Sequence, residues 1–350
     1  MKAVLIDKFV PDVSQLKLSS VPSPIPSASK PIRVRITHAS LTHVDNLYAQ
    51  GLHQNNQRHV KPPFILGTEF AGYVVSAPSS SSFRPGTKVF GGSLGAYAEE
   101  ICIDEANLRK PPSRWTCKEA CAMGSSGAIS WGALVSVGKL KAGEWVCVLG
   151  AAGGLGVVAC QIALALGANV VAVVGGEKKA QVMKRLGVNA VVRYDDPDWE
   201  KRVMEATGGE GVDVVYDSVG AVLSSIKCCA YRGRVIIVGF AARGGQVEEV
   251  KMNRILLKGI TVVGYRFGEH GRRFPDETQA IWREFMNLVE TKGIKPIVYD
   301  REYIGLEAIG AGLKDQASRK SWGRAVMTVT EEEEVKTTIH KDSGTTISRL

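Results

Sequence analysis

The chain has 350 residues, of which 45% are hydrophobic and 23% are charged. These are the proportions of an ordinary globular protein, and the length predicts two domains. No apolar run reaches the roughly 18 residues of a membrane-spanning helix, and the first apolar run is too short for a signal peptide, so we expect an intracellular protein without a membrane partner. The formal net charge of +9 favours polyanionic ligands such as a dinucleotide or an acyl-CoA, although a merely solvated basic surface explains it equally well.

Short apolar segments separated by proline, glycine and serine fill the chain from residue 1 to about residue 120. Examples are MKAVLI, PIRVRI, GYVVSA and YAEEICI. Such segments are typical of short β-strands joined by turns. The first domain is therefore predicted to be all-β.

Strand-like and helix-like segments alternate after Thr116. Apolar runs at residues 145–149, 170–174, 190–192, 212–216 and 235–238 are separated by stretches of helical character. This order predicts a doubly wound α/β domain with a parallel sheet covered on both faces. A further strand, a helix near residues 277–291 and a last strand at 325–329 follow, whereas residues 331–350 lack periodicity and are predicted to be a disordered tail.

The segment at residues 145–156 has the pattern of a dinucleotide-binding loop. An apolar strand, WVCVL, runs into GAAGGLG and then into an apolar helix. A pyrophosphate binds at such a glycine turn because the free N–H groups and the positive end of the following helix face it. The strand before, the helix after and the later βα units all agree, so we interpret the loop as a cofactor site rather than a structural turn.

The end of the second strand indicates which dinucleotide binds. An NAD enzyme normally has an acid at this strand tip, where it bonds the ribose hydroxyls and would repel a 2′-phosphate. Here the tip reads Val-Gly-Gly at residues 174–176, which leaves room for a phosphate that Lys178 or Lys179 can pair with. Glu177 is a competing signal, but its place beyond the tip indicates that it starts the next helix. We therefore predict NADPH as the cofactor.

Several motifs of the chain resemble a known family. They look like the zinc-free, quinone oxidoreductase-like (zeta-crystallin-type) branch of the medium-chain dehydrogenase/reductase superfamily. The resemblance covers about residues 1–330, nearly the whole chain. The motifs are GAAGGLG at 150–156, GTEFAG at 67–72, YDSVG at 216–220, RGRVIIVGF at 232–240 and GYRFGEHGRRFP at 264–275.

The resemblance implies an α/β architecture of two domains. A GroES-like β domain would occupy residues 1–120 and be completed by residues 265–330. A Rossmann doubly wound parallel-sheet domain would lie between them at residues 121–264. The predicted tail at residues 331–350 lies beyond both domains.

Positions that hold the catalytic zinc ligands in related alcohol dehydrogenases carry other residues here. The resemblance aligns them with Thr42, with Thr68 and with residues 123–126, whose hydroxyl and thioether groups do not make a zinc site. The four-cysteine lobe of structural zinc is also missing, and no second pair or nearby histidine completes a site with Cys117 and Cys121. We therefore predict no bound metal.

Hydride donation to an electron-poor acceptor is the chemistry that stays easy without a Lewis acid. A quinone or an α,β-unsaturated carbonyl delocalises the incoming charge onto its own oxygen. We thus predict an NADPH-dependent oxidoreductase that reduces such an electrophilic small molecule. Two alternatives stay open: an enoyl-CoA thioester reductase, and a non-catalytic NADPH-binding protein of a crystallin-like or RNA-associating kind.

The resemblance also implies which residues bind the cofactor. The pyrophosphate side is assigned to Gly150, Ala151, Gly153, Gly154, Leu155 and Gly156. The adenosine phosphate is assigned to Gly176, Lys179 and Tyr194, the nicotinamide side to Val219, Gly239, Phe240 and Phe267, and a late basic position near the cofactor to Arg324. Tyr194 and Phe267 are equally interpretable as core aromatics.

Three residues are candidates for catalysis. Ser130 corresponds to a threonine near the nicotinamide in relatives, and Thr42 occupies a zinc-ligand position. His53 stands where related reductases often have a tyrosine, and a histidine can donate a proton near neutral pH. A solvent-exposed loop histidine without a catalytic role is the competing interpretation of His53.

The chain ends in Ser348, Arg349 and Leu350. This tripeptide is close to Ser-Lys-Leu, which the peroxisomal import receptor reads at a free C-terminus. We therefore expect a peroxisomal protein, with the cytoplasm as the alternative location. The family resemblance further implies a homodimer.

Overall fold

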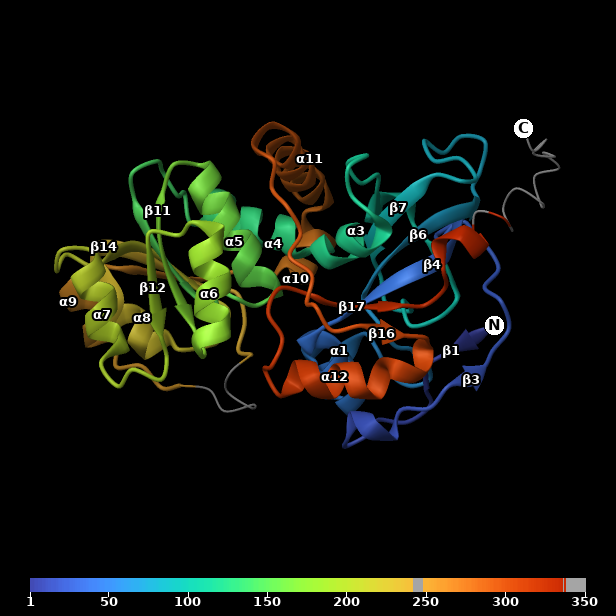
Figure 1. Ribbon diagram of the computed structural model, residues 1–350, viewed down its shortest axis with the longest axis horizontal. Helices are drawn as coiled ribbons and strands as arrows, with labels where there is room; N and C mark the ends of the chain where they lie inside the picture. The colour runs from blue at the N-terminus through green and yellow to red at the C-terminus, as the bar shows by residue number, and fades with distance from the viewer. Residues whose placement is uncertain (242–247, 336, 338–350) are drawn as a thin grey trace. The chain divides into compact units, whose positions relative to one another are not determined.

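The computed structural model describes residues 1–241, 248–335 and 337, and Figure 1 shows the course of the chain. Two compact units are present. The first combines Met1–Ser125 with Pro296–Leu350, and the second is Ser126–Lys295. The C-terminal tripeptide Ser348, Arg349 and Leu350 lies outside the described residues.

A seven-stranded sheet forms the centre of the first unit. Its path runs β16-β17-β4-β6-β7-β9, and β8 pairs with β4. The late strand β17 lies antiparallel to β4, with Ala325 opposite Leu41, so segments far apart in the sequence share one sheet. The strands are β4 (Ile32–Leu41), β6 (Glu69–Ser76), β7 (Lys88–Gly92), β8 (Glu100–Ile103), β9 (Leu108–Arg109), β16 (Tyr303–Ile304) and β17 (Ala325–Thr328).

Short elements cover this sheet and close its core. Ile6, Leu41, Tyr97, Leu313 and Met327 belong to one buried apolar cluster, which joins the N-terminal segment to the returning C-terminal one. The covering elements are the paired strands β1 (Lys2–Ala3) with β3 (Ser19–Ser20) and β2 (Leu5–Ile6) with β5 (Phe64–Ile65), the helices α1 (His43–Gln50), α2 (Gln54–Arg58), α3 (Cys117–Met123) and α12 (Ile309–Ala317), and the short turns η1 (Val13–Gln15), η2 (Glu105–Asn107) and η4 (Leu306–Ala308).

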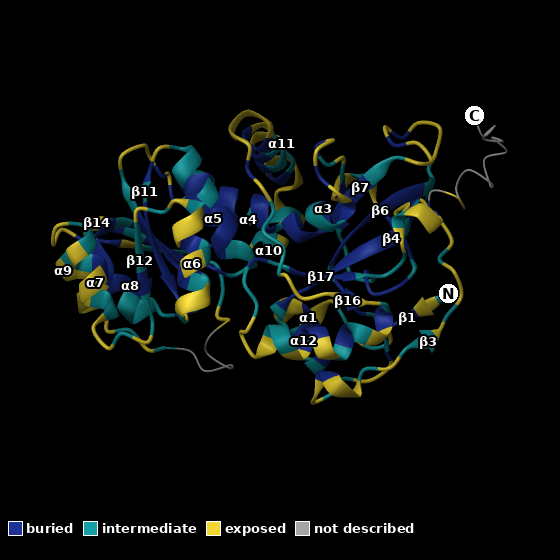
Figure 2. Ribbon diagram, in the orientation of Figure 1, coloured by how far each residue is buried: buried dark blue, intermediate teal, exposed yellow. Residues whose placement is uncertain are grey.

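A six-stranded parallel sheet forms the second unit, in the order β12-β11-β10-β13-β14-β15. Its central strands β10 and β11 are rich in valine and almost entirely buried, and Figure 2 shows them dark blue beside more exposed helices. This arrangement confirms the predicted doubly wound sheet. The strands are β10 (Trp145–Leu149), β11 (Asn169–Val174), β12 (Ala190–Arg193), β13 (Val212–Asp217), β14 (Cys229–Ile237) and β15 (Thr261–Gly264).

The helices of the second unit follow the strands in alternation. An N-terminal group, α4 and η3, precedes the first strand, and α10 with α11 follows the last one. The helices are α4 (Ser126–Trp131), η3 (Gly132–Val137), α5 (Gly154–Ala165), α6 (Glu177–Leu186), α7 (Trp199–Ala206), α8 (Val222–Cys228), α9 (Asn253–Lys258), α10 (Phe267–Arg273) and α11 (Pro275–Lys292).

The second unit extends further along the chain than the sequence indicates. We predict from the sequence that residues 265–330 complete the first domain, but residues 265–295 belong to the second unit. Helix α11 packs on α4 so closely that a Cβ on Gly127 would lie 2.0 Å from the ring of Phe285. Tyr265 contacts Gly132 in the same way. Because these apolar side chains are buried within the second unit, only residues 296 onward return to the first.

The start of the predicted tail is ordered. The Tyr73 hydroxyl donates a hydrogen bond of 2.8 Å to Glu332 Oε2, and the Cys117 N–H donates one of 3.3 Å to Oε1 of the same carboxylate. Val335 is buried. The expectation of disorder from residue 331 is therefore wrong for residues 331–335, since two hydrogen bonds and an apolar contact offset the ordering of this segment.

The described residues include one long apolar helical stretch. Cys117–Val137 is long and apolar enough to span a membrane by length and composition alone, but 72% of its apolar stretch is buried inside the protein. Such burial is typical of core helices. All seven cysteines are buried and form no disulfide.

Replacing Gly127 with alanine is expected to destabilise the second unit by about 1–3 kcal/mol, the usual cost of overpacking a core, because the new Cβ overlaps the Phe285 ring. Thermal unfolding measures the change. Gly268→Ala is the control, since a Cβ there meets no atom within 4 Å. Replacing the opposing ring by a smaller side chain, in Gly127→Ala/Phe285→Leu, should restore part of the stability. A Gly127→Ala variant as stable as the wild type would contradict this packing.

Candidate active site

The loop between β10 and α5 has the geometry of a pyrophosphate cradle. Gly150 adopts a left-handed φ of +68°, and Gly153 caps the helix without any side-chain hydrogen bond. A Cβ on Gly156 would lie 2.4 Å from the carbonyl oxygen of Gly150, so only glycine lets the helix start this close to the loop. The amide N–H groups at the start of a twelve-residue helix therefore face an open position, which suits an anion.

Two hydroxyls brace this loop from either side. The Gly150 N–H donates a hydrogen bond of 2.8 Å to the Tyr194 hydroxyl, which follows β12. The Ser130 hydroxyl lies 3.3 Å from the Leu155 carbonyl oxygen and 3.1 Å from the hydroxyl of Tyr216. In addition, the Ala151 N–H donates to the carbonyl of the neighbouring strand β11. The structure thus brings Tyr194 and Ser130 to the loop, where both hold its shape.

The central position of β10 explains why the loop lies at this edge. Strand β10 pairs in parallel with β11 on one side and with β13 on the other, so the crossover direction reverses there. In open parallel sheets ligands bind beyond the carboxyl ends of the strands at this reversal. Gly154 is the first residue of α5 and Leu155 the second, which leaves their N–H groups at the ligand side.

The tip of β11 presents the predicted glycine pair and an acid. Gly176 caps α6 with a φ of +85°, and Glu177 is the first helical residue, as the sequence predicts. A Cβ on either Gly175 or Gly176 would meet no atom within 4 Å, so the tip is open. Lys179 lies in the first turn of α6. One residue that sequence reasoning missed is Arg193, whose Nη1 lies 3.0 Å from Oε2 of Glu177.

Residues assigned to the nicotinamide side lie after β13 and β14. The Val219 and Gly220 N–H groups donate hydrogen bonds of 2.9 and 2.7 Å to Oδ1 of the buried Asp217. Gly239 approaches the same loop, because a Cβ there would lie 3.1 Å from the carbonyl oxygen of Ser218. The structure therefore brings Val219 and Gly239 together.

Two aromatic residues assigned to the same side are more exposed. The Phe240 side chain is 46% exposed. Phe267 begins α10 and is half-buried, with its ring centroid 6.4 Å from that of Tyr265. Tyr194 packs at the edge of the sheet core, against Trp199, so it serves as a core aromatic and as a loop contact.

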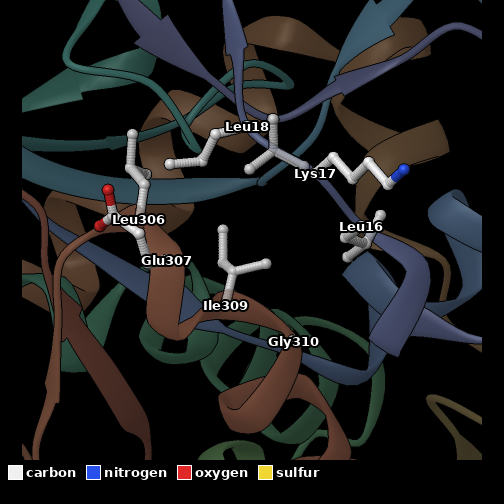
Figure 3. Close-up of a pocket in the computed structure, with 8 residues that line it drawn as sticks. Leu16, Lys17, Leu18, Leu306, Glu307, Ile309 and Gly310 are labelled. Carbon is white, nitrogen blue, oxygen red and sulfur yellow. The ribbon is translucent and has the colours of Figure 1, made fainter.

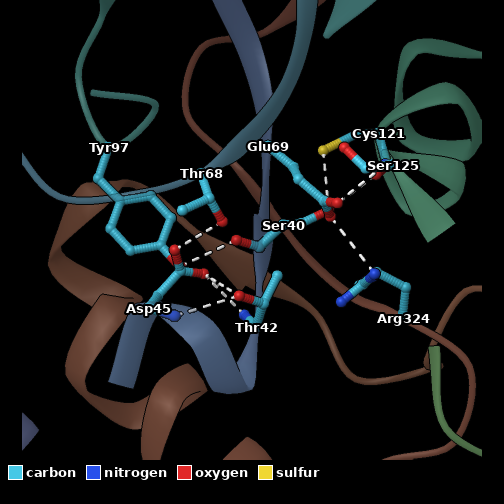
Figure 4. Close-up of polar contacts among 9 residues, drawn as sticks. All are labelled: Ser40, Thr42, Asp45, Thr68, Glu69, Tyr97, Cys121, Ser125 and Arg324. Carbon is cyan, nitrogen blue, oxygen red and sulfur yellow. Dashed lines mark hydrogen bonds and ion pairs between the residues drawn. The ribbon is translucent and has the colours of Figure 1, made fainter. Parts of the chain in front are cut away.

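A buried carboxylate, Asp45, organises the polar centre of the first unit (Figure 4). It accepts hydrogen bonds from the Thr42 N–H (2.9 Å), the Thr42 hydroxyl (2.7 Å), the Thr68 hydroxyl (2.9 Å) and the Tyr97 hydroxyl (2.8 Å). Asp45 is fully buried, and this burial raises its pKa to about 6 even though the hydrogen bonds favour the charged form. Four donors on one carboxylate explain how the fold tolerates it.

Thr42 is committed to this network. It caps α1, its hydroxyl donates to Asp45, and the same oxygen accepts a hydrogen bond of 3.2 Å from the Asp45 N–H. The pattern is a reciprocal capping box, which the sequence T-H-V-D at residues 42–45 already signals. The predicted catalytic candidate therefore positions the network, and Asp45 is the residue that sequence reasoning missed.

A second buried carboxylate, Glu69, lies in the same unit (Figure 4). Its Oε1 accepts a hydrogen bond of 2.8 Å from the Ser125 N–H, and its Oε2 lies 3.4 Å from Nη2 of Arg324. A Cβ on Gly124 would lie 2.5 Å from Glu69 Oε2, so this turn also requires glycine. Arg324, assigned to the cofactor by resemblance, is thus the ion-pair partner of an acid that the sequence analysis did not single out.

These groups do not fit a zinc ion. Thr42 and Thr68 direct their hydroxyl protons to Asp45, and Glu69 is paired with Arg324. Across residues 1–241 and 248–335, no three histidine, cysteine, aspartate or glutamate side chains gather as a metal site would require.

His53 caps helix α2. Its Nδ1 accepts a hydrogen bond of 3.1 Å from the Asn55 N–H, and its ring stacks on Tyr48 with centroids 4.2 Å apart. Because Nδ1 accepts, the neutral ring carries its proton on Nε2. A proton donor at this position would need the doubly protonated ring, which gives up the cap.

A small cavity lies elsewhere in the first unit (Figure 3). Its volume is about 280 Å³, and it contains none of the residues assigned to cofactor binding or catalysis. Its walls are mostly apolar, and Lys17 and Glu307 are the charged residues among them. The lining residues are Val4, Leu16, Lys17, Leu18, Leu306, Glu307, Ile309 and Gly310.

Both halves of the chain match known protein families. Residues 28–113 match the alcohol dehydrogenase GroES-like domain family, and residues 154–290 match the family described as zinc-binding dehydrogenase. The chain is 30% identical over 313 residues to quinone oxidoreductase-like protein 2 of Bos taurus, covering 88% of this chain and 87% of the relative. It is 30% identical over 310 residues to a quinone oxidoreductase of Pseudomonas aeruginosa, covering 87% and 93%.

A solved structure agrees with these relatives. The quinone oxidoreductase of Escherichia coli complexed with NADPH superposes with a TM-score of 0.82 at 27% identity, covering 94% of this chain and 100% of that one.

Replacing Asp45 with asparagine is expected to change how stability depends on pH. The folded-state pKa of Asp45, about 6, lies above the ordinary aspartate pKa of 3.8, so the folded protein binds the proton more tightly. Stability from this group is present below about pH 4 and is lost as the pH rises through 6, by up to about 3 kcal/mol. Denaturant unfolding of Asp45→Asn should lack this slope.

The comparison between the two proteins isolates Asp45, because every other titrating group is shared. Asparagine cannot accept four hydrogen bonds, so a uniform loss of stability at all pH values is also expected. The same pH dependence in wild type and variant would show that Asp45 does not titrate in this window.

Proposed function

Because the chain belongs to the quinone oxidoreductase branch of the medium-chain dehydrogenase/reductase superfamily, we propose that it reduces a quinone or an α,β-unsaturated carbonyl with NADPH and without zinc. The observation that carries the proposal is the glycine cradle at residues 150–156 in a chain whose Thr42 and Thr68 hydroxyls bond a carboxylate instead of a metal. The chain is an oxidoreductase that binds NADPH.

The residues of the second unit suit the cofactor. When bound, NADPH supplies a hydride. The N–H groups at the start of α5 would hold the pyrophosphate, and the open tip at Gly175 and Gly176 leaves room for the adenosine phosphate. The loop after β13, fixed by Asp217, would border the nicotinamide side through Val219. An acceptor that stabilises its own negative charge needs orientation and dry walls rather than a Lewis acid.

A substrate panel tests the proposal. NADPH oxidation is measured with quinones, enones and enoyl thioesters, with and without a chelator, and the metal content of the protein is measured by elemental analysis. We expect turnover of quinones or enones, no loss with chelator and no stoichiometric metal. Loss of activity on chelation, or one zinc per chain, would overturn the zinc-independent mechanism.

Enoyl-CoA thioesters are the second candidate substrates. The last twenty residues hold five acids against three bases, so the remaining chain carries a net +11, and a basic protein attracts the phosphates of coenzyme A. Preferential turnover of enoyl thioesters in the panel would favour this alternative. Tight NADPH binding without turnover of any class would favour the non-catalytic one.

We also propose that the chain forms a homodimer through β15. This strand ends the sheet path, and Thr261 and Gly264 are exposed. An open edge strand pairs readily with the same strand of a second copy. In a two-fold dimer the same surface of both subunits then forms the interface. Exposed apolar residues lie on β14 (Tyr231) and on α9 (Leu256 and Leu257), which contacts β14, so an interface that extends beyond the edge strand would have apolar surface to bury. Light scattering measures the mass in solution, and a monomer would contradict the proposal.

Peroxisomal import is a proposal that depends on Ser348, Arg349 and Leu350 alone. The import receptor reads this kind of tripeptide at a free C-terminus. A fusion with a fluorescent protein before residue 1 should be found in peroxisomes, and deletion of the last three residues should abolish this localisation. A diffuse signal from the intact fusion would indicate the cytoplasm.

His53 can be tested with a variant that keeps its helix cap. Asparagine caps helices well, so His53→Asn keeps the hydrogen bond to the Asn55 N–H and removes the imidazole. If His53 protonates the enolate left by hydride addition, enone turnover should fall about 10²-fold or more. Quinone turnover should fall less, since a hydroquinone anion takes its proton from water. His53→Ala is the companion variant, and equal small effects on both substrate classes would leave His53 as a cap only.

A further inference from the structure

Arg193 lies beside the tip of the second strand of the parallel sheet. It is the last residue of β12, and in the register of the two strands it is opposite Val174, the last residue of β11. The ribose of the adenosine half of a dinucleotide binds beyond this tip in doubly wound sheets. The register alone therefore brings a guanidinium to the place where NADPH and NADH differ.

Two carboxylates hold this guanidinium. Nη1 lies 3.0 Å from Glu177 Oε2, Nε donates a hydrogen bond of 2.9 Å to Asp195 Oδ1, and Nη2 contacts Asp195 Oδ2. All three side chains are partly exposed, at 42% for Arg193 and 53% for each acid. An arginine has five N–H donors, and these contacts use three of them. Two donors are left for an oxyanion.

The Glu177 carboxylate is the acid that argues for NADH. An acid near this tip accepts hydrogen bonds from the ribose hydroxyls and repels a 2′-phosphate. Here Arg193 engages that carboxylate and shares its positive charge between Glu177 and Asp195. Lys178 and Lys179 follow in the first turn of α6, and the tip at residues 175–176 offers open space. Arg193, Lys178 and Lys179 together carry three positive charges against the two negative charges of Glu177 and Asp195, so the local charge favours a phosphate.

We propose that Arg193 sets the cofactor preference of this protein. It acts as a switch with two parts: it withholds Glu177 from the ribose hydroxyls, and it supplies N–H donors to the 2′-phosphate. This inference rests on the proposed function only in that NADPH is the cofactor. It assigns a specificity-determining role to Arg193, and it gives Glu177 the opposite role of favouring NADH when released.

Equilibrium binding of both nucleotides tests the proposal without turnover. Titration calorimetry is carried out with NADPH, NADH, and the adenosine fragments 2′,5′-ADP and 5′-AMP. In Arg193→Ala we expect NADPH and 2′,5′-ADP to bind at least tenfold more weakly, the loss of one charge-assisted phosphate contact. NADH and 5′-AMP should bind as tightly as in wild type or more tightly, because Glu177 becomes available.

Further variants separate the two parts of the switch. Arg193→Lys keeps the charge and should retain most of the NADPH affinity. Arg193→Ala/Glu177→Gln should lose any gain in NADH affinity, since the acid is gone. Arg202→Ala is the matched control, because Arg202 is 49% exposed and is paired with Asp196 and Glu205. Arg193 and Arg202 both line a surface hollow of about 620 Å³, but Arg202 lies in α7 rather than at the strand tip. It should leave all four ligands unchanged.

Specific results would overturn the inference. Equal weakening of NADPH and NADH in Arg193→Ala would show a general structural effect, and unchanged NADPH binding would show that Arg193 does not reach the phosphate. If Arg202→Ala weakened NADPH binding as much as Arg193→Ala, the effect would come from the overall charge of the protein rather than from Arg193. Failure of the proposed function is distinguishable, because a wild-type protein that binds NADPH but reduces no acceptor leaves the binding comparison intact.

Discussion

The close approach of Gly156 to the carbonyl oxygen of Gly150 is the constraint on which the cofactor site depends. Any side chain at residue 156 would separate α5 from β10. The helix starts against the loop, and its N-cap residue, Gly153, has no side chain to bond the first N–H groups. The unsatisfied donors and the positive end of the helix are then concentrated where an anion binds. A steric condition at one residue thus becomes an electrostatic property of the site.

The rest of the second unit holds this loop at a fixed place. Strand β10 is central in the sheet, so the loop emerges at the point where the crossovers diverge. Tyr194 ties the end of β12 to Gly150, and Ser130 ties α4 to the first turn of α5. Helix α11 packs on α4 through Phe285 and Gly127, which extends the support to the last helix of the unit. The residues that favour one cofactor over another need only differ at the strand tip, where side chains are exposed.

Periodicity and glycine motifs predicted the parallel sheet, the cofactor loop and the start of α6 at Glu177 because these features depend on local sequence. The division at Lys295 could not be predicted, since it follows from the contact of Phe285 with Gly127, two residues far apart in the chain. Arg193 was missed for a similar reason: its importance comes from strand register against Val174. Asp45 carried a local signal, the capping box, but only burial and the Thr68 and Tyr97 hydroxyls make it the centre of a network.

The first unit shows how buried carboxylates can be compensated by the side chains and amides of the protein itself. Asp45 and Glu69 are two of the buried carboxylates of this unit, and each would be costly if left alone. Asp45 is compensated by four hydrogen-bond donors, whereas Glu69 is compensated by Arg324 and one amide N–H. The hydroxyls of Thr42 and Thr68 stabilise the negative charge of Asp45 by donating hydrogen bonds to it. Because the Thr42 and Thr68 hydroxyls donate to Asp45 and Arg324 pairs with Glu69, the first unit balances these two acids with its own side chains.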